Sequence, residues 1–152
     1  MLKQRISLQS VPGAYEVLRR VEEYVHNSGL EPSLLTLAKM RASQINGCAF
    51  CLDMHSKEAR KLGETEQRLY LLNAWREAPL YSDRERAALA WTEAVTLISE
   101  THAPDEVYEQ ARAQFSEKEL VDLSTAIGMI NLWNRLVIGF RVQHPVVTAK
   151  AA

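Results

Sequence analysis

Long basic runs are missing from this sequence, and so is any marked excess of charge of one sign. No run of Lys and Arg is longer than the pair Arg19–Arg20, and the formal net charge over 152 residues is −1. Because proteins that bind nucleic acid concentrate Lys and Arg on one surface, this pattern gives little support to that class of partner. We therefore expect no nucleic-acid partner.

Long apolar segments are missing as well. The longest apolar stretches are interrupted by Asn, Arg or Gly well short of the ~20 residues that span a bilayer. The N-terminal stretch MLKQRISLQS has neither the apolar core nor the cleavage site of a signal peptide. We expect a cytoplasmic protein with no membrane partner.

Cysteine is scarce, and Cys48 and Cys51 are the two that the chain contains. A disulfide between residues so close in sequence would constrain the unfolded chain little. In a reducing compartment such a pair is more typical of catalysis or metal binding than of a structural bridge. The remaining composition, 47% hydrophobic and 24% charged, is that of an ordinary globular protein, and we expect residues 1–152 to form a single domain.

The hydrophobic pattern is helical almost throughout, without strand-like alternation or a convincing hairpin turn. Pro, Gly and two S-x-x-E capping boxes mark the expected helix ends. They predict a compact all-α fold with helices near residues 17–25, 32–45, 48–62, 65–74, 82–98 and 116–140, and a short one opening at Pro104. The last helix is apolar on most faces, which indicates central burial or an oligomer interface.

Polar residues interrupt this apolar last helix. Asn131, Trp133, Asn134 and Arg135 follow one another within about one turn. They indicate either buried polar pairing that fixes the register of the helix or a pocket at a subunit interface.

The stretch NGCAFCLDMH contains both cysteines of the chain and a histidine four residues after the second. Its Asn-Gly pair breaks the preceding helix, so Cys48 falls in the first turn of the next one. Steps of three and four then place Cys48, Cys51 and His55 on one helix face. Free backbone N–H groups and the positive end of the helix dipole favour thiolate, and His55 can accept a proton from Cys51. These groups are suited to peroxide reduction or thiol–disulfide exchange.

Other interpretations of this stretch stay open at the level of spacing. A thioredoxin fold places C-x-x-C after a strand, and no strand is predicted here. The two cysteines and His55 are also plausible zinc ligands, although a closed site needs a fourth ligand and the spacing of the other histidines nominates none. In the remaining interpretation, both cysteines are buried apolar side chains and the histidine is a surface residue.

Two segments resemble a known family. LAKMRASQINGCAFCLDMHSKEARKLGE, residues 37–64, is similar to the core segment of the alkylhydroperoxidase D-like family, within the carboxymuconolactone decarboxylase superfamily. The string N-G-C-x-x-C-x-x-x-H with a preceding S-Q is the specific part. ERAALAWTEAVTLI, residues 85–98, resembles the helix that follows in many members, so that the resemblance covers the middle half of the chain.

The resemblance implies an all-helical subunit that assembles into a homo-oligomer, either a trimer or a hexamer. It also implies an antioxidant peroxidase that reduces organic hydroperoxides, with Cys51 as the peroxidatic cysteine, Cys48 as the resolving cysteine and His55 in the proton relay. The implied reductant is a thiol protein, thioredoxin-like or lipoyl-bearing. Neither a cofactor nor a metal is expected.

The chain departs from the family pattern at two relay positions. Founding members carry a glutamate twelve residues before the first cysteine, where this chain has Thr36, and a histidine before the second cysteine, where it has Phe50. Threonine cannot serve as a carboxylate base. We predict Glu93 as the substitute, because a charged residue on an otherwise apolar stretch invites a functional reason. A solvated helix face or a salt bridge between subunits is the alternative.

Two further functions stay open. The missing glutamate at Thr36 is compatible with a non-enzymatic redox sensor or assembly module whose cysteines switch its state. A decarboxylase-type member of the superfamily is the second alternative, although that chemistry does not rest on a C-x-x-C pair.

Overall fold

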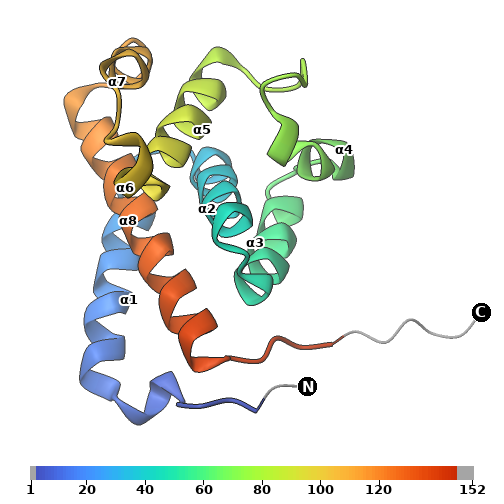
Figure 1. Ribbon diagram of the computed structural model, residues 1–152, viewed down its shortest axis with the longest axis vertical. Coiled ribbons are helices and arrows are strands. Elements are labelled where there is room, and N and C mark those ends of the chain that lie inside the picture. Colours follow the sequence, from blue (N-terminus) through green and yellow to red (C-terminus); the bar gives the residue numbers. More distant parts are fainter. Residues whose placement is uncertain (1–2, 147–152) are drawn as a thin grey trace, which may run out of the picture.

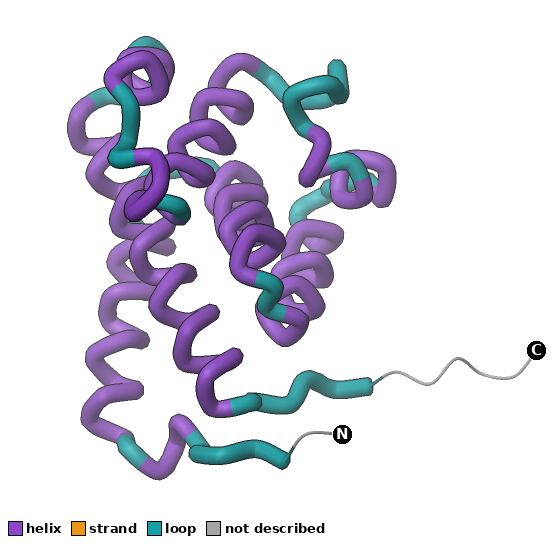
Figure 2. The backbone as a smooth tube through the Cα atoms, viewed as in Figure 1, coloured by secondary structure: helices purple, strands orange, loops and turns teal. Residues whose placement is uncertain are grey.

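The computed structural model describes residues 3–146, and within them the protein is all-helical, as the sequence predicts (Figure 2). No strand occurs in this range. In chain order the elements, with η for a short 3₁₀-helix, are η1 (Leu8–Ser10), α1 (Pro12–His26), α2 (Pro32–Asn46), α3 (Ala49–Lys61), α4 (Glu66–Tyr70), η2 (Leu72–Ala74), α5 (Asp83–Thr96), α6 (Ile98–Thr101), α7 (Asp105–Arg112) and α8 (Glu117–Phe140).

Local sequence sets most of the helix ends. Proline opens α1 and α2, where the missing N–H has no intrahelical partner to lose. Both predicted capping boxes form at the starts of α5 and α8. The Ser82 and Ser116 hydroxyls accept the backbone N–H of Glu85 and Glu119, and each glutamate carboxylate accepts the N–H of its serine.

Two helices are shorter than predicted. The helix predicted near residues 65–74 is divided into α4, which ends at Tyr70, and the 3₁₀-helix η2. The sequence predicts a continuous helix through Ile98, but α5 ends at Thr96 and a separate helix of four residues follows. The Thr101 hydroxyl donates to the carbonyl oxygen of Ala94 over 2.7 Å. Because this bond satisfies a carbonyl at the end of α5, the helix can stop there without leaving that group unpaired.

The central element of the fold is α2, which packs against α3, α5 and α8 (Figure 1). The helix α1 lies along α8 on the side away from α3 (Figure 1). Most of α2 is buried, through Leu34, Leu35, Thr36, Leu37, Ala38, Met40, Ala42 and Ser43. Since the C-x-x-C stretch follows directly from the end of this helix, the close-packed core fixes its position.

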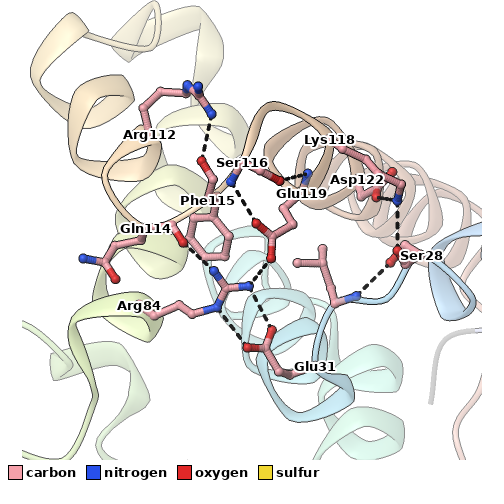
Figure 3. Close-up of polar contacts among 11 residues, drawn as sticks. Ser28, Glu31, Arg84, Arg112, Gln114, Phe115, Ser116, Lys118, Glu119 and Asp122 are labelled. Atoms are coloured by element: carbon pink, nitrogen blue, oxygen red, sulfur yellow. Dashed lines mark hydrogen bonds and ion pairs between the residues drawn. The ribbon is translucent and has the colours of Figure 1, made fainter.

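A charge network joins three helix starts (Figure 3). Arg84, in the first turn of α5, donates to Glu31 over 2.9 Å and to Glu119 over 2.7 Å. It also donates to the carbonyl of Gln114, and its guanidinium lies 4.2 Å from the ring centroid of Phe115. A planar guanidinium can make all of these contacts at once, so one residue ties the starts of α2, α5 and α8 together.

The two ends of the described chain meet at one end of the molecule (Figure 1). The backbone N–H of Arg5 donates to the carbonyl of Phe140 over 2.9 Å, and its side chain donates to the carbonyl of Gly139 over 3.1 Å. The N-terminal segment is therefore held against the end of α8.

The outer face of α8 exposes apolar side chains. Val121 and Leu132 lie on one side of the helix and are exposed, although the same helix buries ten other residues. Ile138 is exposed on another side, near the end of the helix. Within residues 3–146, no helix combines the length and the apolar character needed to cross a membrane.

Candidate active site

The predicted C-x-x-C at a helix start is confirmed. Gly47 ends α2 in the left-handed conformation, with φ 70°, which glycine adopts without strain. Cys48 is then the N-cap of α3, and its sulfur accepts the backbone N–H of Cys51 over 3.3 Å. The polarised N-terminus of α3 thus points one of its free donors at the first sulfur.

Cys48 and Cys51 form a disulfide, with their Cα atoms 5.4 Å apart. Both are buried, with exposed fractions of 0% and 1%. They pack in an apolar group with Ala42 of α2 and with Ile130 and Val137 of α8. The pair is therefore shielded from bulk solvent on the side of α8.

His55 lies one turn after Cys51 on the same face of α3, as predicted, and it is 5% exposed. Its Nδ1 lies 2.8 Å from Oε2 of Glu58, while its Nε2 is buried and has no hydrogen-bond partner. The hydrogen bond with His55 lowers the pKa of Glu58, against the opposing effect of burial, so this carboxyl is ionised at neutral pH. Because an ionised carboxylate can only accept, Nδ1 donates the hydrogen of this bond, and Nε2 is the ring nitrogen left without a partner.

A cavity of about 450 Å³ opens beside these residues, and Cys51, His55 and Glu58 line it. Cys48 does not. The rest of the wall is mainly apolar and comes from Leu8, Tyr15, Phe50, Met54, Ile130, Trp133, Val137 and Val142. Its remaining polar residues are Gln4, Gln9, Arg19, Glu22 and Lys39. The volume and the mixture of apolar walls with few polar groups are typical of a small-molecule site.

Two of the charged residues at the cavity neutralise each other. Lys39 donates to Glu22 over 2.8 Å, and the indole N–H of Trp133 donates to the same carboxylate over 2.9 Å. Trp133, predicted to lie in buried pairing or a pocket, thus has its ring at the cavity and its N–H satisfied. The indole N–H and the lysine therefore both hold the Glu22 carboxylate in place.

A buried amide network lies behind the disulfide. The amide nitrogen of Asn46 donates to the side-chain oxygens of Asn131 and Asn134, each over 2.9 Å. Asn134 in turn donates to the hydroxyl of Ser43 over 3.1 Å, and Asn131 donates to the hydroxyl of Thr96 over 3.0 Å. The network fixes the end of α2 against α8, directly before the cysteine pair. Such buried polar pairing is one of the two alternatives that the polar residues in the last helix predict.

The structure does not bring Glu93 to this cavity. Its carboxylate accepts from Arg41 over 2.7 Å, from the indole of Trp75 over 2.8 Å and from Arg76 over 2.5 Å. Burial raises the pKa of Glu93, but the three hydrogen bonds outweigh burial and leave the pKa lowered. Glu93 thus lies in an ion-pair cluster between α2, α5 and the segment that follows η2, within a single chain.

The two positions at which the chain departs from the family pattern have different surroundings. Thr36 is buried, and its hydroxyl donates to the carbonyl of Pro32 within the same helix over 2.8 Å. Phe50 lines the cavity. The carboxylate that contacts His55 is instead Glu58, which sequence reasoning missed. Its spacing was the available signal, since a residue three positions after His55 lies on the same helix face.

The sequence also leaves open a zinc site at Cys48, Cys51 and His55. Among the residues that the structure describes, no group of three or more His, Cys, Asp or Glu side chains is arranged to hold a metal ion.

Residues 12–94 match the carboxymuconolactone decarboxylase family, a segment that contains α2, α3 and the cysteine pair. The chain belongs to this family. It is 44% identical over 138 residues to the uncharacterized protein YdfG of Bacillus subtilis (strain 168), which covers 90% of this chain and 94% of that protein.

Solved structures give the same assignment. The crystal structure of a protein of unknown function from Agrobacterium tumefaciens, described as a candidate antioxidant defence protein AhpD, matches with a TM-score of 0.92 and 51% identity. The match covers 95% of this chain and all of that one (100%), and it confirms the predicted alkylhydroperoxidase D-like type. The apo debrominase Bmp8 has the same fold, with a TM-score of 0.81 over 90% of this chain and 74% of that one, at 19% identity. The function of this family member must therefore be argued from its site.

Proposed function

We propose that this chain is a thiol-dependent peroxidase that reduces organic hydroperoxides through Cys51 and Cys48. The observation that carries the proposal is the cavity itself. Its apolar wall contains one cysteine of a disulfide pair and a buried histidine whose Nε2 has no hydrogen-bond partner. The likeness to an AhpD candidate supports the same activity.

The reaction begins from the reduced pair. Nε2 of His55 takes the proton of the Cys51 thiol, and the thiolate attacks the terminal oxygen of the hydroperoxide ROOH. The O–O bond breaks, the alkoxide leaves as ROH with the proton from His55, and Cys51 becomes a sulfenic acid. Cys48 then attacks this sulfur, water leaves and the disulfide forms. Two electrons have passed from the two thiols to the peroxide.

Glu58 completes the relay in this proposal. Its ionised carboxylate holds the hydrogen of the ring on Nδ1 and stabilises the imidazolium that forms during proton transfer. The sequence pattern predicts Glu93 for this task. We assign it to Glu58 because Glu58 lines the cavity and contacts His55, whereas Glu93 is surrounded by Arg41, Arg76 and Trp75.

The proposal extends to partners and location. We propose that the protein works in the cytoplasm, where a thiol reductant restores the pair after each turnover. We also propose a homo-oligomer, because exposed Val121 and Leu132 lie on the same side of α8 and give it an apolar surface that a second copy can cover.

The test measures consumption of cumene hydroperoxide with dithiothreitol in excess. Wild-type protein is expected to turn over many times, and both Cys51→Ser and Cys48→Ser proteins are expected to lose turnover. Mass spectrometry of the Cys48→Ser protein should show a sulfenic acid on Cys51. If the double serine variant consumes hydroperoxide at the wild-type rate, the proposal is wrong. A redox sensor, the alternative function, would oxidise once and then stop.

A further inference from the structure

The cavity receives chemically different side chains from two helices. Cys51 and His55 reach it from α3, whereas Tyr15, Arg19 and Glu22 reach it from α1. The helix α3 packs against α2, and α1 packs against α8 (Figure 1), whose apolar side chains also line the cavity. A ligand that fills the cavity with its reactive group at Cys51 therefore meets α1 with another part of its structure.

Two of the three α1 side chains at the cavity are held by partners. Tyr15 packs edge-on against Trp133, with ring centroids 6.1 Å apart. Glu22 accepts from Lys39 over 2.8 Å and from the indole of Trp133 over 2.9 Å. Because residues at steps of three and four share a helix face, Arg19 stands between Tyr15 and Glu22 on the same face. The cavity face of α1 is thus held in place on both sides of Arg19.

The Arg19 side chain has unused hydrogen-bond donors. It is exposed, and among the residues that the structure describes it has no hydrogen-bond or ion-pair partner. The other charged side chains at the cavity do have partners, since Lys39 pairs with Glu22 and Glu58 accepts from His55. A guanidinium stays charged in proteins and carries several N–H donors in one plane. Arg19 therefore offers the cavity a cation that can bind an anionic group.

We propose that the cavity binds an amphipathic carboxylate, with Arg19 pairing with the carboxylate and the apolar wall covering the rest of the molecule. The hydroperoxide that the protein reduces is then one that carries a carboxylate, such as an oxidised fatty acid. This substrate class rests on the proposed function, whereas binding of the carboxylate itself needs no turnover. The planar guanidinium matches the two oxygens of a carboxylate. A cavity of about 450 Å³ with mainly apolar walls suits the remainder of such a molecule.

The exposure of Arg19 sets the size of the expected effect. An ion pair at an exposed site is weak, so a charge on the ligand should change its affinity by about fivefold. Added salt screens such a pair and should reduce the difference. Because Arg19 has no partner to lose among the described residues, its replacement should leave the fold intact.

The first test measures binding without turnover. Phenylbutyrate and its neutral amide are titrated by calorimetry into the oxidised wild-type protein. Phenylbutyrate is expected to bind about fivefold more tightly than the amide at low salt, and the difference should shrink as salt is added. Equal affinities of acid and amide, or no binding of either, overturn the proposal.

Two neighbouring arginines provide a matched pair of variants. Arg20 is also exposed on α1, but it pairs with Glu16 over 3.4 Å and does not line the cavity. Arg19→Gln should lose the preference for the acid, Arg19→Lys should keep part of it and Arg20→Gln should keep all of it. An unchanged preference in Arg19→Gln contradicts the proposal. An equal loss in Arg19→Gln and Arg20→Gln would reflect only the net charge of the protein and would contradict it as well.

The last test applies the same preference to the reaction. With dithiothreitol in excess, linoleic acid hydroperoxide is expected to have a KM about fivefold below that of its methyl ester, with a similar kcat. Arg19→Gln should remove this difference. If both hydroperoxides are consumed with equal KM, the carboxylate preference is wrong and the peroxidase function stands. If neither is consumed while phenylbutyrate still binds through Arg19, the peroxidase function is wrong and carboxylate binding stands.

Discussion

Nδ1 of His55 lies 2.8 Å from Oε2 of Glu58, one turn further along α3. The contact determines which ring nitrogen remains available for proton transfer. With Nδ1 bound to a carboxylate, the buried and unpartnered Nε2 is the atom left to exchange a proton beside Cys51. The proposed relay needs no residue from α2, where the resemblance places the glutamate of founding family members.

Replacing Glu58 by Gln should slow hydroperoxide turnover by about a hundredfold, the low end of what a positioned acid–base group contributes. The glutamine amide can donate as well as accept, so it no longer fixes the hydrogen on Nδ1 of His55. Because Glu58 acts through the histidine as a positioning residue, the pH–rate profile should also change shape. Asp53→Asn on the same helix, which removes an ion pair with Lys57 outside the cavity, is the control and should keep the wild-type profile.

Replacing Glu93 by Gln tests whether Glu93, rather than Glu58, serves the proton relay. The ion-pair cluster predicts a loss of about 2 kcal/mol in the free energy of unfolding, because Arg41 and Arg76 lose their common partner. Turnover per folded molecule should stay close to wild type. Urea unfolding and steady-state peroxidase assays measure the two effects. A stable variant without turnover would restore the relay role that the sequence analysis predicts for Glu93.

Asn134→Ala should lower the free energy of unfolding by about 2 kcal/mol, since it removes one of the two hydrogen bonds that the Asn46 amide donates and the one that the Ser43 hydroxyl accepts, and it empties a buried site. The urea midpoint reports the loss. The exposed Asn73→Ala should change the midpoint little. A neutral result for Asn134→Ala would mean that water replaces the missing amide.

Acid stability should depend on Glu119. The backbone N–H of Ser116, together with the Arg84 side chain and the Ser116 hydroxyl, lowers its pKa from 4.5 to about 2. A carboxyl with a lowered folded-state pKa stabilises the fold above about pH 4.5, and this contribution is lost as the pH falls towards 2. Glu119→Gln keeps the capping geometry but should flatten the fall of stability across this window. Thermal melts from pH 5 to about pH 2 check this, with the exposed Glu109→Gln as the control.

Leu132→Asp tests the proposed oligomer. A charge on the exposed face of α8 should dissociate the assembly, because covering it would bury an unpaired carboxylate. Light scattering after size exclusion gives the mass. Leu71→Asp, at a similarly exposed leucine away from α8, should leave the mass unchanged. A wild-type monomer would refute the oligomer itself.

Features that depend on neighbouring residues could be predicted from the sequence. Both capping boxes, the helix break at Asn46–Gly47 and the placement of Cys48 at the start of α3 follow from local geometry, and the structure has them all. His55 falls on the predicted face because helical spacing is regular. The break after Thr96 could not be predicted, because it depends on a side-chain bond from Thr101 rather than on a breaking residue.

Features that depend on tertiary partners were harder to predict. A glutamate on an apolar stretch looks the same in sequence whether it serves a relay or an ion pair, and the arginines that contact Glu93 lie 52 and 17 positions away. Charged residues surround Glu58 in the sequence, so its position three residues after His55 does not stand out. The amide network behind the disulfide was predictable only in kind, since Asn46 and Asn134 lie 88 positions apart.

The cavity takes its walls from both ends of the chain. Gln4, Leu8 and Gln9 contribute from one end, and Val137 and Val142 from the other. Synthesis proceeds from the N-terminus, so the cysteine pair leaves the ribosome well before α8 does. A nascent chain therefore carries two thiols that have no cavity around them, open to any oxidant or thiol nearby. Selectivity for what reaches Cys51 begins when the last helix has docked.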